Sequence, residues 1–168
     1  VPYARGRSRS LPPERVIEHM RALKERGYHE VVLTGIHLGS YGLDFSPPLP
    51  LGKLLRQLEE KETPHRIRLS SVEPMDFSAE LIHFLSTSKK VCTHLHVPIQ
   101  SGEDEILKGM NRNYSRSFLF DLIQELHRAI PGLSIGADVI VGFPGETEEK
   151  FKKTYELVES LPFSYLQV

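Results

Sequence analysis

The chain has 168 residues, which suggests about one domain, and its 39% hydrophobic and 26% charged residues are too apolar and too balanced for a disordered chain. The net charge of −1 gives no overall signature of nucleic-acid binding, although it permits a local basic patch, and no stretch approaches the ~20 apolar residues of a membrane helix. Cys92 is the only cysteine, so the chain forms no intramolecular disulfide, fits a reducing compartment, and cannot alone hold an iron–sulfur cluster or a thiolate zinc site.

The start of the chain predicts a helix followed by a strand. The helix opens at the pair Pro12-Pro13 and carries apolar residues at helical spacing, with Ser10 as its cap and Gly27 as its stop. The apolar run 30–34 is typical of a strand that is buried on both faces, as in parallel sheets.

The rest of the chain continues this alternation. Further helices are predicted over 51–58, 78–85, 103–110, 115–130 and 148–161, with Ser78 and Thr147 as caps, and further strands over 66–71, 94–100, 133–141 and 163–168. The alternation predicts an α/β fold with a parallel sheet and right-handed crossovers, either doubly wound or curled into a barrel. In both folds the functional site lies at the carboxyl ends of the strands, so the residues directly after each strand are the candidates.

The first two strand ends carry glycines, hydroxyls and a carboxylate. Thr34 and Gly35 open a glycine-rich segment whose backbone amides either approach a ligand closely or belong to a flexible connector. Ser70, Ser71 and Glu73 either bind a ribose or an amino acid through hydrogen bonds, or form a helix-capping turn. Each of these signals is weak when it is taken singly.

The later strands carry histidines, a carboxylate and a tight turn. His94 and His96 point to one face of a strand; with no third ligand, a hydrogen-bonded pair inside a barrel is favoured over a metal site. Asp138 lies within the next strand and needs a partner, so it is either structural or lines the site. Gly142 begins a turn into a helix whose first amides could take an anion or an adenine edge.

Several arginines are candidates for contacts with phosphates. Arg5, Arg7 and Arg9 form a basic, glycine-containing arm, and Arg112 lies between two asparagines. A solvated arm is the alternative interpretation. Because the candidate residues follow successive strands, their joint placement predicts one composite site, without naming its ligand.

Five segments together resemble the radical S-adenosylmethionine methylthiotransferases and occur in that family's order. They are 1–10, which is similar to the stretch after the family's CxxxCxxC motif, and 33–42, 68–74, 94–102 and 138–147. The Thr-Gly-Ile-His sequence at 34–37 is most similar to the subgroup that acts on threonylcarbamoyladenosine in tRNA. Sister subgroups act on isopentenyladenosine in tRNA or on an aspartate of a ribosomal protein.

The resemblance implies a partial (β/α)6 barrel of the TIM-like kind, lacking its first strand and its cluster loop. Residues 1–168 would be a radical S-adenosylmethionine core domain cut at both ends, without the amino-terminal methylthiotransferase domain and the carboxy-terminal TRAM-type domain. The family's cofactors are S-adenosylmethionine and two 4Fe–4S clusters, whose cysteines this segment does not contain. We therefore expect the segment alone to bind no cluster, to be inactive, and to associate through uncovered sheet edges.

The resemblance also assigns candidate roles to single residues, but it names no catalytic residue and no metal ligand. Thr34 and Gly35 would meet the amino group of S-adenosylmethionine. Ser71 and Glu73 would lie near its ribose or methionyl part. The remaining candidates for cofactor binding are Gln100, Asp138, Val141, Gly142 and Phe143, the last three at the adenine, and those for substrate or RNA contact are Arg5, Arg7, Arg9 and Arg112.

The resemblance implies a cytoplasmic enzyme with tRNA as its substrate and an electron-donor protein as a further partner. A different class of function stays open at this point, namely a (β/α) module without redox chemistry in which the glycine loops hold a nucleotide passively. A CxxxCxxC motif ending two residues before Val1 would favour the radical enzyme, and its absence would favour the binding module.

Overall fold

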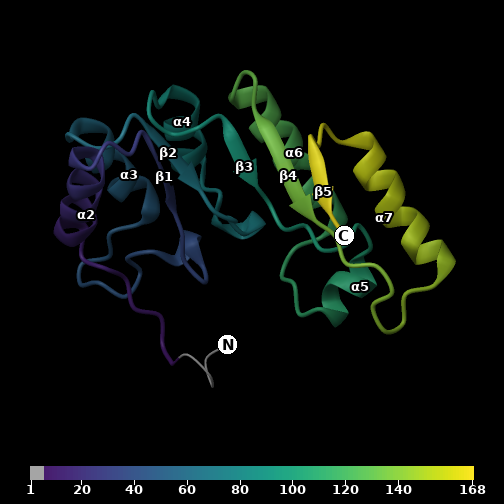
Figure 1. The fold of residues 1–168 in the computed structure, drawn as a ribbon. Helices are drawn as coiled ribbons and strands as arrows, with labels where there is room; N and C mark the ends of the chain where they lie inside the picture. Colours follow the sequence, from purple (N-terminus) through teal and green to yellow (C-terminus); the bar gives the residue numbers. More distant parts are fainter. Residues whose placement is uncertain (1–5) are drawn as a thin grey trace.

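The computed structural model describes residues 6–168, in which short strands and longer helices alternate (Figure 1). No helix in this range is long and apolar enough to cross a membrane. The elements in chain order are α2 (Pro13–Glu25), β1 (Glu30–Leu33), η1 (Leu38–Ser40), α3 (Leu51–Glu60), β2 (Arg66–Leu69), η2 (Pro74–Asp76), α4 (Ala79–Thr87), β3 (His94–His96), α5 (Asp104–Gly109), α6 (Arg116–Ala129), β4 (Ser134–Asp138), α7 (Glu148–Ser160) and β5 (Tyr165–Gln167).

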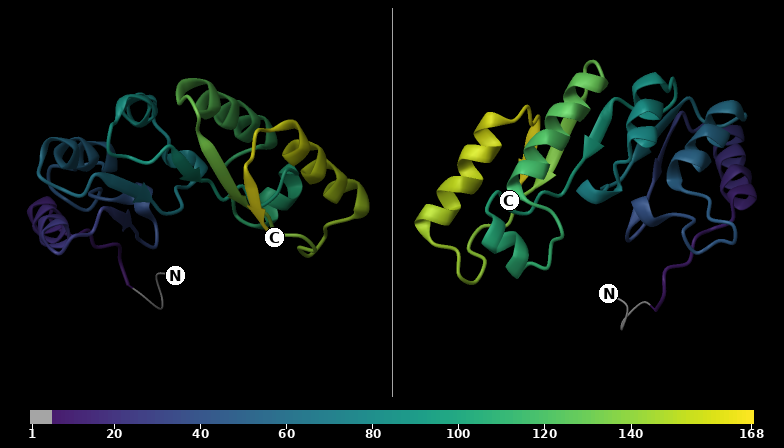
Figure 2. Two further views of the ribbon diagram at one scale, coloured as in Figure 1. Left: turned by 45° about the horizontal axis from the view of Figure 1, so that its top comes forward. Right: turned by 180° about the vertical axis from the view of Figure 1, so that it is seen from behind.

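All strand pairs in the described part of the chain are parallel. β1 pairs with β2, and β3, β4 and β5 form a second set in that order. The two sets meet where Ile67 bridges to Val91 and where the Val72 amide donates to the His96 carbonyl over 3.0 Å. The strands thus follow one arc, with helices on its outer side (Figure 2). This arrangement confirms the prediction of parallel α/β units.

The hydrophobic core lies between the strands and the outer helices. Ile67 and Leu69 of β2 are buried, whereas Arg66 and Arg68 alternate with them and point to the inner side of the arc. Burying such aliphatic side chains is the main favourable contribution to folding, about 25 cal/mol per Å² of apolar surface. One face of the strands therefore holds the fold together, while the other is left polar.

Most local signals of the sequence are confirmed, but the cap of the first helix, the burial of the first strand and the lengths of several strands were predicted wrongly. Ser78 and Thr147 cap α4 and α7, and Gly27 ends the first helical segment at a φ of 85°. Ser10 does not cap α2, because its hydroxyl accepts a bond from the Gly42 amide instead. β1 is not buried on both faces: Val32 is 51% exposed, since it points to the open inner side of the arc.

Candidate functional site

A cavity of about 1060 Å³ lies at the carboxyl ends of β1 and β2. Its walls are the arm 6–11, the inner side of α2, the segment 31–41 and the loop 111–114. Six of the residues singled out from the sequence line this cavity, namely Arg7, Arg9, Thr34, Gly35, Glu73 and Arg112. The structure thus brings together candidates from four separate parts of the chain.

An ion pair closes one side of this cavity. The Arg112 guanidinium donates to the Glu73 carboxylate over 2.7 Å, and both side chains are partly exposed. Asn111 turns the chain with a φ of 57°, and the Tyr114 hydroxyl donates to the Pro98 carbonyl, which fixes the loop after α5. Burial raises the pKa of Tyr114 to about 12, so this hydroxyl keeps its proton. Arg112 is therefore anchored next to Glu73.

A second pair, His37 with Asp76, lines the same cavity and was missed by sequence reasoning. The Nε2 atom of His37 lies 2.7 Å from Oδ2 of Asp76, joining the turns η1 and η2 that follow β1 and β2. Each residue follows a predicted strand end by a few positions. That spacing was the available signal, but it does not show that two short turns would place the side chains in contact.

The candidates after β3 and β4 form a separate group that does not line this cavity. Gln100 forms a β-bridge with Val139. Its backbone amide donates to the Asp138 carbonyl, and its carbonyl accepts from the Ile140 amide, both over 2.8 Å. The Gly142 amide donates to the Glu146 carboxylate over 2.6 Å. Val141 is half exposed.

Three further candidates complete the placement of the predicted site. The Phe143 ring packs against Gly109 at the end of α5, so it approaches the element that leads into the cavity loop. Ser71 is exposed at the end of β2 and does not line the cavity. Arg5 lies outside the described residues.

A chain of hydrogen bonds crosses the inner side of β3, β4 and β5. Asp138 Oδ1 lies 2.8 Å from His96 Nε2, and the Tyr165 hydroxyl lies 3.1 Å from His96 Nδ1 and 3.0 Å from His94 Nε2. Burial, followed by the charge of Arg68, lowers the pKa of His94, which favours its neutral form. Asp138 thus has the partner that a carboxylate in a strand requires, and both histidines are hydrogen-bonded, as predicted, through the Tyr165 hydroxyl that they share.

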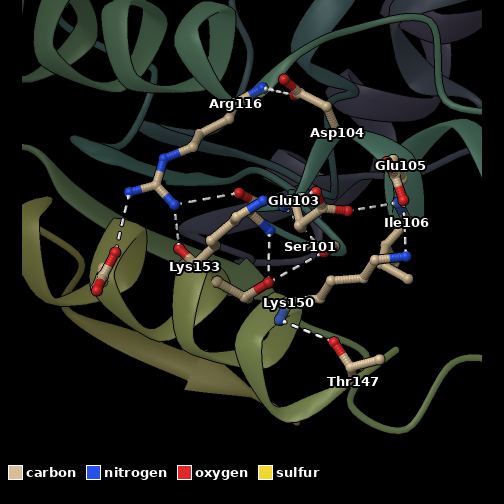
Figure 3. A network of polar contacts seen from close by, with 12 residues as sticks. Ser101, Glu103, Asp104, Glu105, Ile106, Arg116, Thr147, Lys150 and Lys153 are labelled. Atoms are coloured by element: carbon tan, nitrogen blue, oxygen red, sulfur yellow. Dashed lines mark hydrogen bonds and ion pairs between the residues drawn. The ribbon is translucent and has the colours of Figure 1, made fainter. Parts of the chain in front are cut away.

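The segment after Gln100 is held by a polar network that joins α5, α6 and α7 (Figure 3). Thr154 Oγ1 accepts from the Gly102 amide over 3.0 Å and lies 3.1 Å from the Ser101 hydroxyl. Burial of Glu103 alone would raise the pKa of its carboxyl group. The hydrogen bonds donated by the Ile106 amide and Lys153 outweigh this effect, so the pKa of Glu103 is lowered. This part of the predicted strand-end motif is therefore structural.

A sequence profile of the radical SAM superfamily matches residues 1–158, and this match, together with the parallel strands and the cavity at their ends, decides the family. The chain belongs to the radical SAM superfamily.

Sequence relatives are tRNA methylthiotransferases. A threonylcarbamoyladenosine tRNA methylthiotransferase of Bacillus subtilis is 47% identical over all of this chain and 37% of its own length. A tRNA-2-methylthio-N(6)-dimethylallyladenosine synthase of Thermoanaerobacter sp. is 44% identical over 97% of this chain and 35% of its own.

Solved radical SAM structures share the fold of this chain. The methyltransferase TsrM of Kitasatospora setae superposes with a TM-score of 0.71 at 18% identity, over 92% of this chain and 30% of that one. Coproporphyrinogen III oxidase of Escherichia coli, a radical SAM enzyme, superposes with a TM-score of 0.62 over 93% of this chain and 37% of its own. The predicted partial barrel is thereby confirmed. The chain spans just over a third of the length of the curated methylthiotransferases it matches.

Membership of the radical SAM superfamily implies two cofactors, S-adenosylmethionine and a 4Fe–4S cluster, and the cavity fits only the first. The wall of the cavity combines the paired Glu73 carboxylate and Arg112 guanidinium with the polar backbone at Gly35, which suits the charged and polar groups of S-adenosylmethionine. A cluster does not fit, because buried Cys92 is the only cysteine and no group of three metal-ligating side chains occurs within residues 6–168. Burial is also the main factor that raises the pKa of the Cys92 thiol.

Proposed function

We propose that this chain is the core of a tRNA methylthiotransferase that adds a methylthio group to C2 of N6-threonylcarbamoyladenosine. The observation that carries the proposal is the 47% identity, over the whole chain, to the Bacillus subtilis enzyme named for this substrate. The cavity at the ends of β1 and β2 supports the proposal, because it is large enough to hold a small-molecule cofactor.

In this proposal the cavity holds S-adenosylmethionine by its amino-acid end. Thr34 and Gly35 bind the amino group, and Glu73 orients the methionyl or ribose part, whereas Ser71, which does not line the cavity, contributes no contact there. Arg112 balances the charge of Glu73 over 2.7 Å and keeps the carboxylate in place before the cofactor arrives. Bound S-adenosylmethionine supplies a methyl group and, on reductive cleavage, a 5′-deoxyadenosyl radical.

The group after β3 and β4 is proposed to hold the adenosine end of the cofactor. Gln100 and Asp138 lie on adjacent strands, and Val141, Gly142 and Phe143 follow β4. The hydrogen bond from His96 fixes one oxygen of Asp138 and leaves the other for a ligand. Backbone groups of the turn at Gly142 would meet the adenine edge, with the Glu146 carboxylate holding the turn.

The remaining parts of the activity are proposed to come from outside this chain. The cysteines of the radical cluster and of a second cluster, and an electron-donor protein, fall into this class, so the isolated segment is expected to be inactive. The basic arm of Arg7 and Arg9, together with Arg5, would contact tRNA phosphates. Such an enzyme would work in the cytoplasm, where its tRNA substrate resides.

A second candidate function is methylthiolation of dimethylallyladenosine in tRNA. It is favoured by several relatives of 39–44% identity that are named for this product. The two candidates differ in the substituent on N6, since one is an anionic amino-acid derivative and the other an apolar alkenyl group.

Deletion of the gene tests the proposed function directly. Total tRNA from the deletion strain is digested to nucleosides and measured by mass spectrometry. We expect the 2-methylthio form of threonylcarbamoyladenosine to disappear and the form without the methylthio group to accumulate, with recovery on complementation. Loss of methylthio-dimethylallyladenosine instead would establish the second candidate, and unchanged tRNA would overturn both.

A further inference from the structure

The pair of His37 and Asp76 has no role in the proposed binding of S-adenosylmethionine, although it lines the same cavity. His37 is 48% exposed at its side chain and Asp76 only 18%, and both line the cavity, so the ring is the more accessible member of the pair. Asp76 takes the Nε2 hydrogen over 2.7 Å, and no described residue bonds to Nδ1. The unused nitrogen is therefore the atom that a ligand can reach.

The local backbone holds this pair in place. The Asp76 amide donates to the Glu73 carbonyl over 2.9 Å, and the Ser40 hydroxyl donates to the His37 carbonyl over 2.8 Å. A side chain at Gly39 would collide with the Asp76 carboxylate, so only glycine lets the two turns approach this closely. The pair is thus a built feature of the cavity wall, next to Glu73.

The charges around the pair favour an anion. Glu73 is already paired with Arg112, and Asp76 with His37. Arg7 and Arg9 line the cavity, and neither takes part in an ion pair among residues 6–168. For Nδ1 to donate to an anion, both ring nitrogens must carry a proton, and the Asp76 carboxylate at Nε2 lies where it balances that charge.

The substituent of threonylcarbamoyladenosine ends in a carboxylate, whereas the dimethylallyl group carries no charge. We propose that His37, oriented by Asp76, recognises the carboxylate of the threonylcarbamoyl group and so distinguishes this substrate from neutral adenosines. The inference rests on the proposed function and adds to it a residue that determines specificity. Hydrogen bonds to charged groups are strong enough for such discrimination.

The test compares two anticodon stem-loops of one sequence, one with threonylcarbamoyladenosine and one with plain adenosine, bound to the complete enzyme. We expect the wild type to prefer the modified loop and His37→Gln to lose roughly tenfold of this preference, because glutamine retains a donor to Asp76 but lacks Nδ1. His19→Gln is the matched control, since His19 is an exposed histidine on the same cavity. It should leave the preference unchanged.

The outcomes separate this inference from the proposed function. If His37→Gln leaves the preference intact, or weakens the binding of both stem-loops equally, the pair is structural and the inference is overturned. If the wild-type enzyme methylthiolates dimethylallyladenosine and not threonylcarbamoyladenosine, the proposed function fails and the inference fails with it. Product mass for the wild type, measured alongside binding, decides which of these cases applies.

Discussion

At the scale of single residues, Glu30 gives the clearest electrostatic prediction. Hydrogen bonds from Arg68 and then Arg66, at 2.8 and 2.7 Å, lower the pKa of Glu30 from its ordinary 4.5 to about 2. A lowered carboxyl pKa means that the stabilisation is complete above about pH 4.5 and is lost as the pH falls towards 2. Glu30→Gln should therefore be less stable than wild type at pH 7, and the gap should close near pH 2.

Urea unfolding of both proteins across this pH range checks the prediction, with Glu25→Gln as a control at the exposed end of α2. A gap that stays constant with pH would show that Glu30 acts through packing alone.

The sequence can show that a polar side chain needs a hydrogen-bond partner, but it does not show which residue provides it. The sequence shows that a carboxylate such as Asp138 within a strand requires a partner, because burying it alone is costly. It does not show that His96 and Tyr165 provide the bonds, since Tyr165 reaches them only when β5 aligns beside β4. Arg112 illustrates the same limit: its charge suggested phosphate, and its position after α5 gives it Glu73.

At the scale of elements, Thr154 fixes α7 to the start of α5. Its hydroxyl is buried and bonds to the Gly102 amide and the Ser101 hydroxyl. Thr154→Val leaves both groups without this partner, so we expect a loss of about 1–3 kcal/mol in the free energy of unfolding, measured by urea denaturation. Thr154→Ser retains the hydroxyl and should lose less, and equal losses in the two variants would contradict a role for the hydrogen bonds.

Element types were predictable because the apolar spacing and the caps are local signals. Strand lengths were overestimated for reasons that are also local. The strand predicted over 94–100 ends at His96, because Pro98 has no amide hydrogen for the sheet and Gln100 adopts a φ of 66°. The predicted strand 133–141 narrows to Ser134–Asp138, and the residues beyond it become the approach to the turn at Gly142.

At the scale of the whole molecule, the strands form an arc with two free ends. Within the described residues, β1 and β5 each pair with a strand on one side only. The expectation that the segment associates through these edges stays a prediction. The parallel alternation could be read from the sequence, whereas the division of the candidates into a cavity group and a β3–β4 group could not, because it depends on the curvature of the sheet.

The central claim is that both groups bind one molecule of S-adenosylmethionine, the cavity group at its amino-acid end and the turn at Gly142 at its adenine. Calorimetric titration of the complete enzyme with S-adenosylmethionine tests it on Glu73→Gln and Gly142→Ala, with Glu80→Gln, exposed on α4, as control. Glu73→Gln removes a charged partner of the cofactor, and Gly142→Ala places a side chain at a φ of 77°. Each variant should weaken binding of S-adenosylmethionine by roughly five- to tenfold. Weakening by Glu73→Gln with no effect of Gly142→Ala would contradict the claim of a single shared site.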